Sequence, residues 1–137
     1  MKRSCSEVQI PMAHENFSEE RFDELIERAI DTLPAKFRDA LDNLIIERQE
    51  HPDEHTRQLM GLGPNDLLLG LYAGIPLTQR HVDAPPPLPD RIILYRQQIL
   101  AACRTEAEFV EQLRRTLLHE IGHYFGMDEE ELAQAGY

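Results

Sequence analysis

A long helix is predicted near the C-terminal end of the sequence, over about residues 105–126. When its residues are placed 100° apart, most of the apolar ones fall on the side opposite His119. These apolar residues are Val110, Leu117, Ile121 and Tyr124, flanked by Leu113 and Phe125. A helix of this length has to pack such a side against the rest of the chain, so it organises whatever fold forms around it.

The other side of this helix carries His119-Glu120-Ile121-Gly122-His123. Two histidines four residues apart project from one helix face, and their imidazole nitrogens can bind one Zn²⁺. Glu120 lies about 100° around the helix from His119, where it can reach a metal-activated water without becoming a ligand. An ordinary polar histidine pair is the alternative. The HExxH spacing on a helix with an apolar back favours a metal site with Glu120 as the catalytic base.

A third ligand is expected just beyond the helix, because a catalytic zinc takes three protein ligands and a water. Gly126 can adopt a positive φ and turn the chain back towards the metal. The residues from His119 onwards then follow HExxHxxGxxE, which makes Glu129 the first candidate and Asp128 the second. The acidic run 128–131 has an alternative interpretation as the first turn of a last helix capped by Asp128.

The rest of the chain predicts helices followed by a few short strands. Ser18 can cap a helix whose apolar residues recur to Leu33, and Pro34 ends it, with a short second helix as an option over 34–38. Strands are predicted over 44–47, 67–72 and 91–95, and the polar run 49–57 is expected to be a loop. This order indicates an α+β fold. Residues 1–16 are expected to be a flexible tail, and 17–137 a single domain.

Composition excludes several classes of protein. With 14 Lys and Arg against 25 Asp and Glu among 137 residues, the net charge of −11 argues against nucleic-acid and anionic-membrane partners. No apolar run approaches the roughly 20 residues that span a bilayer, and no signal peptide follows the basic start. Cys5 and Cys103 stand alone and are expected to be reduced, which favours a cytoplasmic location.

Taken together, these motifs resemble the small bacterial zincin-like metallopeptidases, sometimes called minimal zincins. The resemblance spans about residues 17–132 and rests on four stretches of sequence. These are the early helix ending at Leu33-Pro34, the residues 68–76 with Arg80, the segment 88–92, and His119 to Gly126. It implies a compact α+β zincin-like core with a short sheet of about three strands beside the metal helix. Zinc would lie on His119, His123 and an acidic residue past Gly126, with Glu120 as general base.

The expected function is therefore that of a zinc metallopeptidase acting on a peptide or protein substrate. A metal-binding interaction module with little catalysis is the main alternative, and hydrolysis of a non-peptide amide is a weaker one. Substrate is expected to pair with an exposed strand edge, either that of 67–72 or that of 91–95. Tyr72, Tyr95, Tyr124 and Arg80 are the candidate donors to the reacting carbonyl. The sequence leaves the oligomeric state open.

Overall fold

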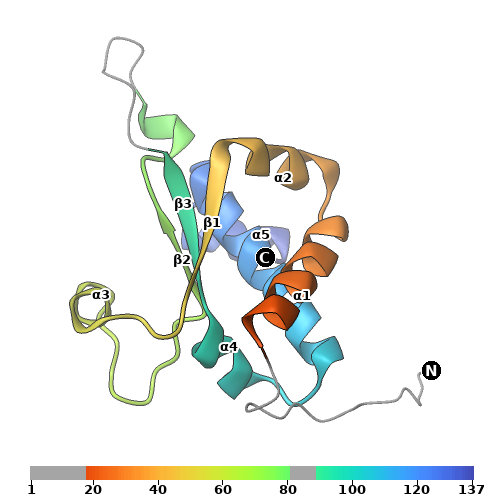
Figure 1. The fold of residues 1–137 in the computed structure, drawn as a ribbon. Coiled ribbons are helices and arrows are strands. Elements are labelled where there is room, and N and C mark those ends of the chain that lie inside the picture. The colour runs from red at the N-terminus through yellow and green to blue at the C-terminus, as the bar shows by residue number, and fades with distance from the viewer. Residues whose placement is uncertain (1–17, 81–88) are drawn as a thin grey trace.

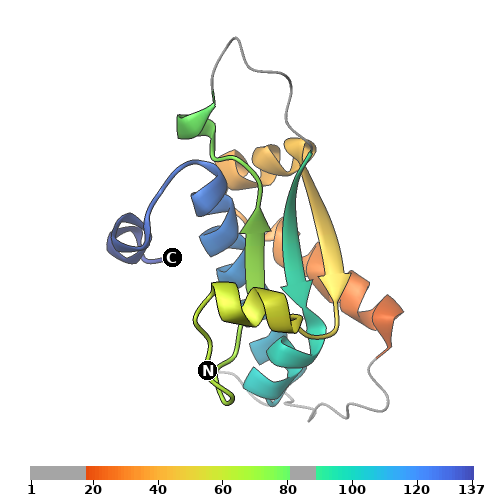
Figure 2. The same ribbon diagram turned by 90° about the vertical axis from the view of Figure 1, so that its left-hand side faces the viewer.

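The computed structural model describes residues 18–80 and 89–137, and in this part of the chain the predicted α+β class is confirmed. Figure 1 shows α1, α2 and α5 on one side of a three-stranded sheet and α3 on the other side. Figure 2, turned by 90°, looks onto the sheet and shows the last helix beside α5. The tail predicted over 1–16 lies outside the described residues.

The helices are α1 (Glu19–Asp31), α2 (Ala35–Ala40), α3 (Glu54–Leu59), α4 (Arg96–Ala102), α5 (Glu106–Tyr124) and α6 (Glu129–Ala135). The strands are β1 (Leu44–Gln49), β2 (Gly70–Ala73) and β3 (Asp90–Tyr95), and 3₁₀ turns occupy Leu41–Asn43 and Leu77–Gln79. Among the described residues, every helix is too short or too polar to cross a membrane.

The sheet has the order β1-β3-β2, with β3 in the middle. β1 runs parallel to β3, and β2 runs antiparallel to it, so both sides of β3 are occupied by neighbouring strands. The prediction that 91–95 could offer an exposed edge is therefore wrong, because a central strand has used its backbone groups on both flanks. Of the two candidate strands, only β2 lies at an edge of the sheet.

The N-terminal helix α1 forms as its sequence predicts. The Ser18 side chain accepts a hydrogen bond from the backbone N–H of Arg21 at 3.1 Å and caps the first turn. The helix ends at Asp31, just before Pro34. Its apolar face is buried through Phe22, Leu25, Ile26 and Ala29. The optional second helix also forms, as α2.

The core lies between α1, α5 and the inner face of β3. Phe22 of α1 meets Phe109 of α5 edge to face, with 5.4 Å between ring centroids. Leu113, Leu117 and Ile121 have no exposed surface, which confirms the apolar side predicted for the long helix. Each such side chain stabilises the fold by about 1.5–3 kcal/mol through burial. This packing presses one side of α5 onto the sheet and leaves the histidine side free of the core.

The predicted loop over 49–57 is wrong in its second half, where α3 begins. Asp53 caps α3 by accepting from the backbone N–H of Thr56 at 2.7 Å. None of the residues of α3 is buried, so the helix lacks the apolar periodicity by which sequence patterns reveal helices.

Two other elements differ from prediction. The strand expected over 67–72 starts only at Gly70. Residues 67–69 before it are irregular, and of these only Leu69 bonds to β3, its carbonyl accepting from the Tyr95 N–H. The helix α4 follows β3 without a loop and was not predicted. Its seven residues include the buried Ile99 and Leu100. These follow the apolar residues of β3 so closely that the sequence does not show where the strand repeat of two gives way to the helix repeat of 3.6.

Candidate metal centre

The helix α5 carries both histidines on the side that faces away from the core. Thr105 caps the helix by accepting from the backbone N–H of Glu108 at 3.1 Å. The side chains of His119 and His123 keep 30% and 27% of their surface exposed. Their rings lie edge to face with centroids 4.9 Å apart. Two partly exposed imidazoles on one helix face are thus available to share a ligand.

Glu129 brings a carboxylate to these two rings. One of its oxygens lies 2.7 Å from Nε2 of His123, and its carboxylate lies 3.2 Å from Nε2 of His119. Among the described residues, these three form the one group of histidines, cysteines and acids with ligand atoms all within 4.8 Å. Tetrahedral zinc with bonds near 2.0–2.1 Å would separate its ligand atoms by about 3.3 Å. The donor set and its spacing fit a zinc ion.

The ring of His123 is held from behind by the backbone. Its Nδ1 lies 3.0 Å from the carbonyl oxygen of Met127, an acceptor that assigns the proton to Nδ1. Nε2 is then the nitrogen that faces Glu129, and it would give up any proton there on binding a metal. Hydrogen bonds of this kind orient metal-binding histidines and strengthen them as ligands.

The turn between α5 and α6 decides which acidic residue faces the histidines. Gly126 takes φ = 94°, a left-handed conformation that ends α5 and reverses the chain. Asp128 then caps α6 by accepting from the backbone N–H of Glu131 at 2.8 Å, and the Glu131 side chain returns the bond. Asp128 is occupied as a cap, whereas Glu129 projects to His119 and His123.

A close contact between the two helices sets the position of α6. Gly122 lies between the two histidines on α5, and the fully buried side chain of Leu132 packs directly onto it. Any Cβ at position 122 would overlap Leu132. The glycine therefore lets α6 approach closely enough for Glu129 to reach both rings. Sequence reasoning saw that Gly122 leaves room, but Leu132 as the occupant of that room depends on the tertiary fold.

Glu120 lies beside the histidines, turned towards the edge strand β2. Only 8% of its surface is exposed, and its Oε1 accepts from the backbone N–H of Tyr72 at 2.7 Å. Burial raises the pKa of the Glu120 carboxyl, against the opposing effects of His119 and of the Tyr72 hydrogen bond. A carboxylate with a raised pKa is a stronger base than an exposed one.

Glu129 has the opposite shift. Partial burial pushes its pKa up, but the charge of His119 and the hydrogen bonds from both imidazoles outweigh this effect and lower the pKa. The carboxylate is therefore held in the charged form that a cation needs. The two glutamates differ in environment as a ligand and a base would be expected to differ.

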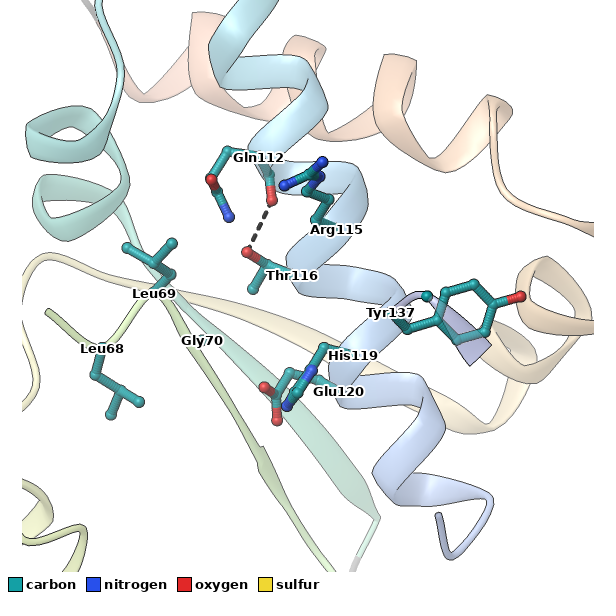
Figure 3. Close-up of a pocket in the computed structure, with 10 residues that line it drawn as sticks. Leu68, Leu69, Gly70, Gln112, Arg115, Thr116, His119, Glu120 and Tyr137 are labelled. Atoms are coloured by element: carbon teal, nitrogen blue, oxygen red, sulfur yellow. Dashed lines mark hydrogen bonds between the residues drawn. The ribbon is translucent and has the colours of Figure 1, made fainter. Parts of the chain in front are cut away.

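Two hollows flank this group of residues. One of about 390 Å³ lies on the His119 side, and Figure 3 shows His119 and Glu120 between the strand segment at Leu69 and Gly70 and the C-terminal Tyr137. The other, of about 300 Å³, lies on the His123 side. It is lined by Tyr72, Gly74, Pro76, Gln79, His123, Gly126, Met127 and Asp128. An extended chain could pass from one hollow to the other along β2.

Two of the four candidate carbonyl donors are bonded to another group, and the other two are buried. Tyr72 donates its hydroxyl to Asp90, and Arg80 forms an ion pair with the same carboxylate. Tyr95 and Tyr124 are buried, with 1% and 5% of their surface exposed. Sequence reasoning missed Asp90. Its local signal is an acidic residue two positions before an apolar run, and that says nothing about where the carboxylate lies.

Comparison with known proteins shows a family and a similar solved structure. The family described as zincin-like metallopeptidases matches residues 41–137. No curated protein sequence matches the chain. A solved structure of a conserved hypothetical protein from Thermo thermophilus is similar at 22% identity and a TM-score of 0.49, covering 87% of this chain and 98% of that one.

Proposed function

Because the chain belongs to the zincin-like metallopeptidase family, we propose that it is a zinc-dependent peptidase with Glu120 as its general base. In this proposal His119, His123 and Glu129 bind the zinc. The observation that carries it is the convergence of three ligand atoms within 4.8 Å beside a buried carboxylate. Metal ligands alone would need no such base, whereas hydrolysis does.

The chain's own residues supply the proton transfer. Zinc, when bound, would acidify a water and polarise the carbonyl of the substrate. Glu120 takes the proton of the attacking water on its carboxylate and passes it to the leaving amine. Its raised pKa suits this exchange, since a group that accepts and then releases a proton works best near the operating pH.

The substrate is proposed to lie along the edge of β2 that does not pair with β3. In an antiparallel pair, alternate residues turn their backbone groups away from the partner strand. The Tyr72 N–H points away from β3 to Glu120, so Gly70, two residues earlier, turns its backbone the same way. A peptide paired with this edge would cross the metal group between the two hollows.

Zinc analysis with a peptide-library digest tests the proposal. Wild type is expected to hold one zinc per chain and to cleave a subset of peptides. His119→Ala and Glu129→Ala are expected to lose zinc, whereas Glu120→Gln keeps zinc and loses cleavage. Asp128→Ala is the matched control for Glu129, because it removes the neighbouring carboxylate and costs about 1 kcal/mol as a lost cap.

Several outcomes would contradict the proposal. Wild type without stoichiometric zinc would exclude the metal centre, and full cleavage by Glu120→Gln would exclude the base. Zinc lost from Asp128→Ala but kept by Glu129→Ala would show that Asp128, and not Glu129, is the third zinc ligand. A metal-binding interaction module is the second candidate, favoured by the small hollows, of about 390 and 300 Å³. Stoichiometric zinc, binding of peptides and no cleavage would support it.

A further inference from the structure

A buried carboxylate, that of Asp90, is connected to the proposed catalytic base through a single residue, Tyr72. Asp90 opens β3 with 2% of its surface exposed, on the face shared by Ile92 and Leu94. Burying a charged carboxylate is costly unless other groups bond to it. Two groups do so through Oδ2: the Tyr72 hydroxyl at 2.5 Å and the guanidinium of Arg80. Among the residues that the structure describes, no group hydrogen-bonds to the second oxygen, Oδ1, which is buried.

Arg80 ties this carboxylate to the loop after β2 and to α5. Its Nε donates to the carbonyl of Ile75 at 2.8 Å. Its guanidinium also lies 5.8 Å from the ring centroid of Tyr124, the residue that follows His123. The Tyr124 ring in turn meets the Tyr72 ring edge to face at 6.1 Å. Through Arg80, Asp90 thus connects β3 with the loop after β2 and with α5.

The chain is shaped to admit this carboxylate. Gly74 follows β2 and lies directly over Asp90, so that a Cβ there would fall 2.9 Å from the Asp90 Cβ and closer still to the carboxylate. A glycine at this point lets the loop close over the buried group. This packing therefore holds the Asp90 side chain in one place.

Tyr72 connects this buried group to Glu120. Its side-chain hydroxyl donates to Asp90, and its backbone N–H donates to Glu120 at 2.7 Å. Burial and the neighbouring Asp90 raise the pKa of Tyr72, so the hydroxyl keeps its proton and remains a donor. One residue is thus fixed at both ends, by Asp90 on its side chain and by Glu120 on its backbone.

We propose that Asp90 is a positioning residue for the reaction: it holds Tyr72, and through the Tyr72 amide it fixes the carboxylate of Glu120. This inference rests on the proposed role of Glu120 as base. Because Glu120 accepts from the amide of an edge strand, its carboxylate would shift whenever that strand moved. The bond from the Tyr72 hydroxyl to Asp90 anchors β2 through a side chain, and this keeps the Glu120 carboxylate in one place.

Two variants and one control test this role in the zinc-loaded protein. Asp90→Asn keeps the shape and removes the charge, and Tyr72→Phe removes the hydroxyl but keeps the amide. Arg91→Gln is the control, because it breaks the exposed ion pair with Glu47 on the next residue of the same strand. The measurements are amide hydrogen exchange at Tyr72 by NMR, zinc content, and kcat and KM on a cleaved library peptide.

Both variants are expected to keep one zinc per chain and to speed exchange at the Tyr72 amide by about tenfold, a loss of roughly 1.4 kcal/mol in local stability. The amide of Leu71, which faces β3, is expected to change much less. A kcat about tenfold lower with KM nearly unchanged is expected, because a displaced base weakens the chemical step and not substrate binding.

Unchanged exchange at Tyr72 in both variants would overturn the proposal, as would equal effects in Arg91→Gln. Loss of zinc from folded Asp90→Asn would assign Asp90 to metal binding instead and also overturn it. If Asp90→Asn fails to fold, Tyr72→Phe decides, since it creates no uncompensated buried charge. If wild type cleaves nothing, the proposed function fails, while the exchange comparison still decides whether Asp90 holds the amide at Glu120.

Discussion

At the scale of the residue, the candidate site depends on groups that do not contact the three proposed ligand atoms themselves. The Met127 carbonyl sets the proton on His123, and Asp128 starts the helix that presents Glu129. Gly122 and Leu132 control how near that helix comes. A change at Gly122 or Leu132 is therefore expected to alter the zinc affinity although the three ligand atoms stay the same.

Gly122→Ala is expected to weaken zinc binding by about 10–100-fold, the range for lost supporting contacts around a metal. The added methyl would overlap Leu132 and move α6 with Glu129. Competition with a fluorescent zinc chelator measures the affinity. Alanine normally stabilises a helix by about 1 kcal/mol over glycine, so the loss cannot come from α5 itself.

The double variant Gly122→Ala with Leu132→Ala provides the control for this prediction. Removing the Leu132 side chain gives the new methyl room and is expected to recover part of the affinity. Affinity for zinc that stays at the wild-type value in Gly122→Ala would show that α6 does not position Glu129.

At the scale of the element, α1 and α5 are joined at their ends by an ion pair as well as by the aromatic contact in the core. Arg21 donates from Nε to Glu106 at 3.0 Å and from Nη2 to the other carboxylate oxygen. The hydrogen bonds from Arg21 lower the pKa of Glu106, and the positive charge of Arg21 acts in the same direction, whereas burial acts against them. This pair links the start of α1 to the first turn of the helix that carries the histidines.

A lowered pKa predicts the pH range in which this pair stabilises the fold. Its contribution is present above the ordinary pKa of a glutamate and is lost as pH falls through the lowered value. Glu106→Gln is therefore expected to lower the free energy of unfolding at pH 7, by at most about 1 kcal/mol since solvent screens part-exposed pairs, and to lower it less at pH 3.

Urea unfolding of the metal-free protein at both pH values measures this difference. Glu111→Gln is the control, because its ion pairs with Arg114 and Arg115 lie within one helix and are exposed. A Glu106→Gln effect that is the same at pH 3 and pH 7 would contradict the assigned pKa.

At the scale of the whole molecule, the proposed ligands come from two helices joined by one turn. His119 and His123 belong to α5, which is packed into the core, whereas Glu129 belongs to the short α6. Zinc shared between them would attach α6 to the rest of the fold. Binding to the native state alone also stabilises it, by about 2.7 kcal/mol at a free concentration 100 times Kd.

Removing zinc with a chelator is therefore expected to lower Tm and to speed amide exchange first in α6. Thermal unfolding with and without the chelator measures the shift, with His119→Ala as the control that should not respond. A wild-type Tm that ignores the chelator, in protein that held one zinc per chain, would contradict a shared metal.

The sequence by itself determined the elements whose evidence lies within one helix. The repeat of 3.6 residues per turn was enough to predict the apolar side of α5, the shared face of His119 and His123, and the cap at Ser18. These features depend on spacing along a few turns, and any fold that keeps the helix keeps them.

Only the tertiary structure decided the contacts between distant segments. Tyr72 and Glu120 are 48 residues apart, and no local pattern announces a bond between a strand amide and a helix carboxylate. The same holds for β3 at the centre of the sheet and for Asp90 beneath Tyr72. Glu129 faces the histidines in place of Asp128 because the turn at Gly126 makes Asp128 the cap of α6, and the packing of Leu132 on Gly122 brings that helix close.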